Sequence, residues 1–228
     1  MRSLRDALCL RVTNRSRETT MYIPPHFAET RPEEIRRLIE SHPLGSLVTH
    51  GVQGLDANQI PFELAEMNGE SGLLRAHVAR ANPIWTEVEN GSDVLVIFRA
   101  EHAYVSPNWY PSKQVTHRLV PTWNYQVVNI YGKIRFTEDE KFLRAVVGRL
   151  TRAHEAKAEG EKAWRMADAP ADFMSAMLGQ IIGVEIEFTR IAAKSKLSQN
   201  REDADRLNAA DELGSRSMAE LSKAMKGV

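Results

Sequence analysis

The stretch of residues 101–131, EHAYVSPNWYPSKQVTHRLVPTWNYQVVNIY, constrains the fold of this 228-residue chain more than any other part of the sequence. Alternating apolar residues predict two strands, 102–106 and 119–136, which a proline-rich loop, 107–118, joins. The stretch holds six large aromatic side chains beside cationic and amide groups. A half-buried strand pair does not require so many rings with polar handles, so we interpret the stretch as a binding surface for a flat, anionic molecule.

Three features of the chain each keep two interpretations open. The aromatic rings suit the packing of one copy of the chain against another as well as they suit a ligand. Arg80 lies where a predicted strand ends and a predicted helix begins, a place where a guanidinium can bind phosphate, but it can equally pair with Glu87 or Glu89 on the surface. Lys113, in the loop between the aromatic strands, faces either a ligand or solvent.

The rest of the chain places predicted strands and helices in separate stretches. The predicted strands are 44–50, 55–64, 72–78, 93–99 and 183–191. The predicted helices are 30–41 with Thr30 as N-cap, 83–88, 137–156 with Thr137 as N-cap, and one from Pro170 to 178 or 181. Residues 93–99 are nearly all apolar, which predicts a central strand buried on both faces. Pro121 and Gly132 predict bulges or edge positions. No βαβ unit repeats, which favours an α+β, mainly β fold: an antiparallel barrel with helices packed outside it.

Composition and charge exclude several classes of function. The chain has 30 cationic and 30 acidic side chains, so its net charge attracts neither nucleic acid nor an anionic membrane. No apolar run approaches the roughly 18 residues of a membrane span. The only cysteine, Cys9, allows neither a disulfide within one chain nor a cysteine metal site, which suits the cytoplasm. Residues 1–20 are Arg-rich and predict a disordered extension or an upstream start, with an organelle-targeting segment as the alternative.

Motifs of common catalytic sites are missing from the sequence. It contains no Gly-x-Gly-x-x-Gly, no Walker lysine loop and no Gly-x-Ser-x-Gly, so a nucleotide would be held by side chains and nucleophilic catalysis is disfavoured. The seven histidines lack the spacing of a metal site, and we predict none. These observations identify no catalytic residue.

Six blocks of sequence resemble the PaiB-type FMN-binding transcriptional regulators across residues 21–208. The blocks are 21–27, 43–44, 77–83 (HVARANP), 104–113 (YVSPNWYPSK), 120–125 (VPTWNY) and 196–200 (KLSQN). The resemblance implies a split β-barrel of the flavin-reductase and pyridoxamine-phosphate-oxidase kind, usually a homodimer with FMN at the subunit interface. It leaves residues 209–228 as a charged C-terminal tail.

Carried over to this sequence, the resemblance implies a set of cofactor-binding residues. Arg80 and Lys113 would lie near the FMN phosphate. The other implied FMN-binding residues are Asn82, Tyr104, Ser106, Trp109, Thr122, Trp123, Asn124, Lys196, Ser198, Gln199 and Asn200. Two departures from the family pattern are Ala100-Glu101, where the family tends to have Gly-Pro, and residues 128–131, which replace a more His-rich run.

Three functions are consistent with this resemblance. The first is a negative transcriptional regulator that responds to flavin or redox state, for which DNA binding requires cationic contacts. The best candidate patch is Arg190, Lys194, Lys196, Arg201 and Arg206, which can also be ordinary surface charge. The second is an FMN-dependent oxidoreductase, in which the cofactor carries the electron chemistry. The third is a flavin or heme carrier without turnover.

Overall fold

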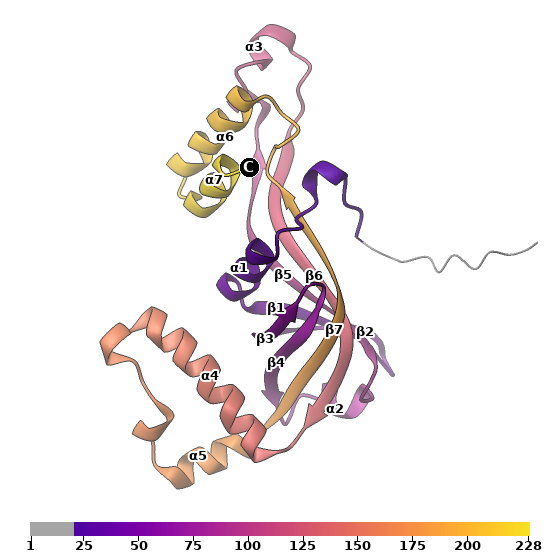
Figure 1. Cartoon of the computed structure of the whole chain (residues 1–228), viewed down its shortest axis with the longest axis vertical. Coiled ribbons are helices and arrows are strands. Elements are labelled where there is room, and N and C mark those ends of the chain that lie inside the picture. The colour runs from indigo at the N-terminus through magenta and orange to yellow at the C-terminus, as the bar shows by residue number, and fades with distance from the viewer. Residues whose placement is uncertain (1–20) are drawn as a thin grey trace, which may run out of the picture.

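Seven antiparallel strands form a single sheet in the computed structural model, which describes residues 21–228 (Figure 1). The strand order is β2-β1-β5-β6-β7-β4-β3, and neighbouring strands all run antiparallel. The strands are β1 (Leu44–Gly51), β2 (Gly54–Pro61), β3 (Glu63–Asn68), β4 (Ser71–Ala79), β5 (Asp93–Val105), β6 (Thr122–Thr137) and β7 (Ile181–Lys196). The predicted segments 93–99 and 102–106 are thus one continuous strand, and the predicted strand 55–64 ends at Pro61.

The main core lies on the concave side of this curved sheet. Val94, Val96 and Phe98 of β5 are buried there with apolar side chains of every other strand except β3, whose Leu64 and Met67 pack against the same core. Leu95 and Ile97 on the opposite face of β5 are only half-buried. The prediction that residues 93–99 are buried on both faces is therefore wrong, because an antiparallel sheet covers only the face turned to the core.

Two helices pack against the barrel, α1 (Pro32–Ser41) and α4 (Glu140–Ala158); α5 (Ala171–Leu178) contacts α4, and the short α2 (Ile84–Glu87) follows β4. The predicted N-caps differ by one or two residues from the observed ones. Helix α1 is preceded by Arg31, because Pro32 takes the first helical position. Helix α4 is capped by Asp139, whose carboxylate accepts a hydrogen bond from Lys141 N, while Thr137 Oγ1 accepts one from Asp139 N.

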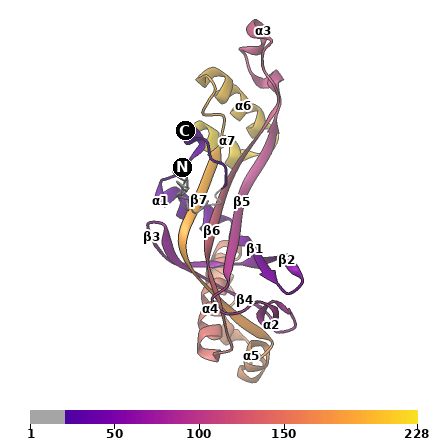
Figure 2. The same cartoon turned by 90° about the vertical axis from the view of Figure 1, so that its right-hand side faces the viewer.

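A second, smaller core lies at the far end of β5 and β6. These two strands extend beyond the barrel to the short helix α3 (Lys113–Thr116), and we call residues 101–125 the arm (Figures 1 and 2). Helices α6 (Asp203–Ser215) and α7 (Ala219–Lys226) cover one side of the arm and bury Tyr110, Leu213 and Met225 with it. The domain boundary expected at residue 208 falls inside α6, and the expected extension 1–20 lies outside the described residues.

Gly132 produces the predicted bulge in β6. The register of β6 against β7 shifts between Tyr131 and Gly132. A Cβ atom at residue 132 would lie 2.5 Å from the Glu187 carbonyl oxygen, so the close approach of the strands requires glycine. Pro121 precedes β6 and lies outside the ladder. None of the helices between residues 21 and 228 combines the length and apolar composition that crossing a lipid bilayer requires.

Candidate functional site

The side of the arm that α6 and α7 leave open carries the aromatic residues. Tyr104 pairs with Trp123, and His102 pairs with Tyr125, so strand alternation puts all four rings on one face. The Trp123 ring centroid lies 5.4 Å from that of His102 and 6.4 Å from that of Tyr104. Tyr104 is 47% exposed and Trp123 50% exposed. We call these four residues the aromatic face; it is an open platform on which a planar molecule can stack.

Two lysines of β7 lie beside the aromatic face. Lys196 Nζ donates to Thr122 Oγ1 and, at 2.7 Å, to the Trp123 carbonyl oxygen. Lys194 is only 7% exposed, and its ammonium lies 5.4 Å from the Tyr125 ring centroid. Burial lowers the pKa of Lys196, and the charges of Lys194 and Arg201 lower it further. A positive field therefore adjoins the rings, as the binding of a flat anion requires.

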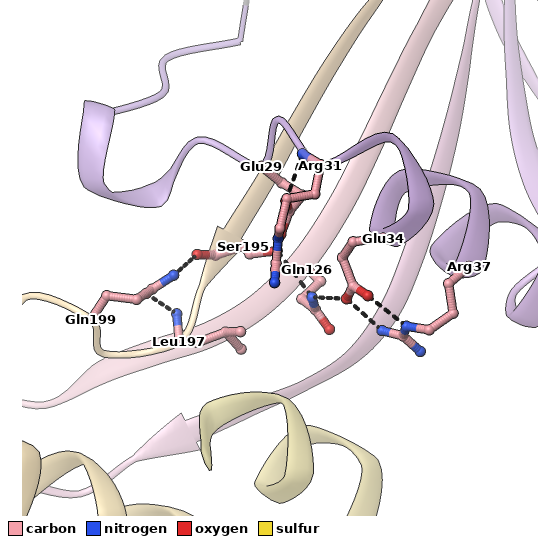
Figure 3. Close-up of polar contacts among 8 residues, drawn as sticks. All are labelled: Glu29, Arg31, Glu34, Arg37, Gln126, Ser195, Leu197 and Gln199. Carbon is pink, nitrogen blue, oxygen red and sulfur yellow. Dashed lines mark hydrogen bonds and ion pairs between the residues drawn. The ribbon is translucent and has the colours of Figure 1, made fainter. Parts of the chain in front are cut away.

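Two expected cofactor residues, Asn124 and Ser198, are buried, and a third, Gln199, is half-buried. Asn124 is fully buried, and its Nδ2 donates to Ser198 Oγ at 2.9 Å and lies 3.3 Å from Met225 Sδ of α7. Gln199 bonds to two backbone groups that precede it: its Nε2 donates to Ser195 O at 2.5 Å, and its Oε1 accepts from Leu197 N at 2.7 Å (Figure 3). In this chain, Asn124 and Ser198 therefore lie on the opposite side of the arm from the aromatic face, and Gln199 stabilises the turn after β7.

A buried polar network that the sequence analysis missed fastens α1 to the base of the arm (Figure 3). Gln126 Nε2 donates to Ser195 Oγ at 2.9 Å and to Glu34 Oε1 at 3.2 Å, and Ser195 Oγ donates to Glu29 Oε2 at 3.2 Å. Arg31 forms an ion pair with Glu29 at 2.6 Å. The polar pair at inward positions of two apolar strands, Gln126 and Ser195, was the available sequence signal.

Neighbouring side chains determine the pKa values of the two carboxylates in this network, Glu29 and Glu34. Burial by itself raises the pKa of Glu29, but the hydrogen bonds and charge of Arg31 and the hydroxyl of Ser195 outweigh it and lower the pKa. The pKa of Glu34 is lowered chiefly by its hydrogen bonds to Arg37, against a smaller opposing effect of burial. Both carboxylates therefore stay charged at neutral pH and hold the start of α1 against β6 and β7.

Ser106, Trp109 and Lys113 lie in the loop at the end of the arm. Ser106 Oγ accepts from Asn108 N at 3.2 Å, and Lys113 Nζ donates to Asn108 Oδ1. The side chain of Asn108 thus holds the Lys113 ammonium within the loop. The Trp109 ring lies 5.1 Å from the guanidinium of Arg216.

Arg80 and Asn82 lie at the other end of the molecule. Arg80 Nη1 forms an ion pair with Glu138 at 2.6 Å, and its Nε donates to Gly179 O at 2.7 Å, next to the end of α5. Its surface partner is therefore Glu138, and neither Glu87 nor Glu89. Asn82 Nδ2 donates to Asn58 Oδ1 at 2.8 Å, while its Oδ1 accepts from Ile84 N at 3.0 Å at the start of α2.

The length of β6 separates the two groups of candidate residues. Its first residue, Thr122, contacts Lys196 beside the aromatic face, and Glu138, the partner of Arg80, follows its last residue. A strand of 16 residues is roughly 50 Å long at about 3.3 Å per residue. Helix α3, which carries Lys113, and helix α5, beside Arg80, accordingly lie at opposite ends of the long axis of the molecule (Figures 1 and 2). A single chain cannot bring Arg80 and Lys113 to one phosphate.

The C-terminal basic set does not form an exposed patch. Lys194 and Arg206 are buried, and Arg206 donates to Met225 O and pairs with Asp203 at 2.8 Å. Arg190 stacks on Tyr131, with 3.5 Å between its guanidinium carbon and the ring centroid. Two members of the expected DNA-contact patch are thus buried, and the other three, Arg190, Lys196 and Arg201, are half-buried, so the set is not one exposed surface within a single chain. Within residues 21–228, no three His, Cys, Asp or Glu side chains gather closely enough to hold a metal ion.

Comparisons with known proteins identify the family to which this chain is similar. The sequence matches the family described as "Putative FMN-binding domain" over residues 21–190. It is 32% identical over 207 residues to "Protease synthase and sporulation protein PAI 2" of Bacillus subtilis, covering 88% of this chain and 96% of that protein.

Two solved structures share the fold. One is the flavocytochrome Anf3 of Azotobacter vinelandii, with a TM-score of 0.55, 10% identity and coverage of 78% of this chain and 74% of that one. The other is a conserved hypothetical protein of Mycobacterium tuberculosis, with a TM-score of 0.53, 14% identity and coverage of 80% and 94%. At such identities the likeness concerns the fold alone, and it confirms the predicted antiparallel split barrel with peripheral helices.

Proposed function

Because this chain belongs to the FMN-binding domain family, with FMN as its cofactor, we propose that it works as a homodimer whose two flavin sites each combine the arm of one protomer with the Arg80 end of its partner. The observation that carries this proposal is the separation of the two candidate groups along β6. Each copy offers one arm and one Arg80 end. Two copies related by a two-fold axis would therefore make two complete sites.

The residues of the two half-sites fit the chemistry of FMN. The aromatic face offers π surfaces for the isoalloxazine ring, with Lys196 and Lys194 beside it. Arg80 offers a guanidinium for the phosphate, because its present partner Glu138 is a mostly exposed carboxylate that the phosphate can replace. When bound, FMN supplies one- or two-electron redox chemistry, while these side chains bind and orient it.

A flavin shared by two protomers would couple flavin binding to dimerisation. A ligand that binds the dimer and not the monomer stabilises the dimer by mass action, and the coupling is reciprocal. This coupling supports a negative transcriptional regulator whose dimer, and hence whose DNA contacts, respond to flavin supply or redox state. The name of the sporulation relative is consistent with a regulatory output. The DNA contacts would belong to the dimer surface, since the C-terminal basic set is occupied within one chain.

Three measurements test this proposal. The absorbance spectrum of the purified protein, titrated with FMN, is expected to show bound flavin at one FMN per chain; a Soret band would redirect the assignment to heme, and failure to bind FMN would refute it. Sedimentation velocity with and without FMN is expected to show tighter dimers with the flavin. A mobility shift on the protein's own promoter region that responds to FMN would support the regulatory output.

A second candidate function is an FMN-dependent oxidoreductase. It is favoured by the half-exposed state of Tyr104 and Trp123, which leaves room for a second planar molecule beside the flavin. NADH or NADPH oxidation by the FMN-loaded protein tests this function. A rate no faster than that of free FMN at equal concentration excludes it, and a faster rate that saturates with the nicotinamide supports it.

A further inference from the structure

Helix α6 lies outside the region that the family description covers, yet it holds the loop at the tip of the arm. The family match ends at residue 190, and α6 begins at Asp203. Within residues 21–228, every side-chain hydrogen bond that connects loop residues 106–118 to a distant part of the chain reaches α6. The remaining side-chain bonds of the loop are local, such as those of Asn108 with Ser106 and Lys113. The loop therefore depends on α6 for its orientation.

Asp205 makes the strongest of these connections. It is 3% exposed; its Oδ1 accepts from Ser112 N at 3.0 Å and its Oδ2 accepts from Ser112 Oγ at 2.6 Å. Both oxygens of one buried carboxylate thus bind one residue, and bonds to an ionised acceptor are stronger than neutral ones. Ser112 directly precedes α3 as its N-cap, and Lys113 is the first residue of that helix. Asp205 therefore fixes the position of the Lys113 backbone through Ser112.

Two further contacts hold the loop on either side of Ser112. Asn208 Nδ2, one turn further along α6, donates to the Trp109 carbonyl oxygen at 2.8 Å. The ring of Tyr110 is almost completely buried in the second core among α6 and α7 side chains. The loop is thereby fixed from Trp109, whose half-buried ring packs against the second core, to Ser112, while the Lys113 side chain stays outside the buried contacts.

We propose that Asp205 is a positioning residue of the flavin site: through Ser112 it orients the start of α3 so that Lys113 meets FMN. This inference rests on the proposed function, since Lys113 is a flavin residue only if the arm binds FMN. It assigns to the C-terminal helices a part of the binding site that the family match does not contain.

The test uses the full-length protein and measures the Kd for FMN by quenching of flavin fluorescence. Asp205→Ala removes both bonds to Ser112 and is expected to weaken FMN binding roughly tenfold or more, the scale of losing hydrogen bonds to a charged group. Asp211→Ala is the matched control, because Asp211 lies on the same helix, is mostly exposed and pairs with Lys226 at 2.6 Å, away from the loop. It should bind FMN as the unchanged protein does.

A second pair of variants separates positioning from general stability and replaces Asp205→Ala if that variant does not fold. Ser112→Ala removes the hydroxyl bond from the loop side, and Ser112→Thr restores a hydroxyl, so affinity should fall in the first and recover in the second. Hydrogen exchange of residues 107–118 should rise in Asp205→Ala and Ser112→Ala but not in Asp211→Ala.

Three results would overturn either the proposed function or the positioning role. If the unchanged protein does not bind FMN, the proposed function fails. If it binds FMN, and Asp205→Ala and Ser112→Ala bind equally well, the positioning role of Asp205 is refuted while the proposed function stands. Weakening by Ser112→Ala that Ser112→Thr does not relieve also refutes the role, because it shows that the hydroxyl bond is not what matters.

Discussion

Two defective variants should restore each other when they share a dimer. Arg80→Ala removes the guanidinium at one end of the molecule, and Lys113→Ala removes the ammonium at the other end. A lost hydrogen-bonded partner of a charged phosphate costs about 1.5–3 kcal/mol, so each homodimer should bind FMN about 10- to 150-fold more weakly. The Arg80 side chain is 36% exposed and that of Glu138 60% exposed. Arg80→Ala therefore leaves no buried charge without a partner, and the variant should fold.

The size of the recovery follows from the symmetry of the dimer. When equal amounts of the two variants exchange subunits at random, about half of the dimers contain one chain of each kind. Such a mixed dimer has one site with both substitutions and one site with neither. About a quarter of all sites should therefore regain the original affinity, which corresponds to roughly one tight site per four chains.

Isothermal titration of the mixture with FMN measures this recovery. The control mixture pairs Arg80→Ala with Asn82→Ala, which lie at the same end of the chain, so each mixed dimer carries one defect in each site and no tight sites should return. If the mixture of Arg80→Ala and Lys113→Ala shows no tight fraction after subunit exchange, the two residues do not serve one site from two protomers, and the split-site reasoning is refuted.

Three further predictions concern stacking, packing and pH. Trp123→Ala should weaken FMN binding by about 0.5–1.5 kcal/mol, or roughly 2- to 12-fold in Kd, with Trp123→Phe closer to the original; an unchanged Kd would remove Trp123 from the site. Gly132→Ala should destabilise the fold by about 1–3 kcal/mol, seen as a lower Tm, because its Cβ would lie 2.5 Å from the Glu187 carbonyl oxygen; an unchanged Tm would contradict that contact. Burial lowers the pKa of His77 below its usual value near 6.5, so the unfolded chain binds the proton more readily and stability should decline as pH falls through about 6.5. Urea unfolding from pH 8 to 5 measures this decline, and His77→Gln should lessen it; an equal decline in that variant would assign it to other groups.

Local sequence patterns located the hairpin turns and most strands, although they did not separate β3 from β2 or join the two halves of β5. The period of two along β4 and β7, the Asn68-Gly69 turn and the bulge at Gly132 are encoded by neighbouring residues, and the structure has each of them. Helix starts were displaced because Pro32 and Asp139 compete with Thr30 and Thr137 for the first positions. Such competition depends on backbone geometry that spacing does not specify.

The relative positions of the site residues were beyond local pattern. Arg80 and Lys113 are equally cationic in sequence, and only the path of β6 reveals that they lie at opposite ends. Asn124 and Trp123 are neighbours in one motif, but strand alternation turns Asn124 toward α7 and Trp123 outward. Asp205 lies in a stretch of alternating charges, and its burial depends on α6 docking against the arm. Each of these is a property of long-range packing.

The uninterrupted course of β6 from the bulge to the tip of the arm limits how this chain can change in length. Because side chains alternate along a strand, deletion of one residue between Tyr125 and Ile130 would turn Trp123 toward α7 and Asn124 to the outside. Deletion of two residues would keep the faces but draw the arm in by about 7 Å. The loops can therefore vary in length. In β6, by contrast, a deletion of one residue exchanges the two faces of the arm, and a deletion of two residues shortens it.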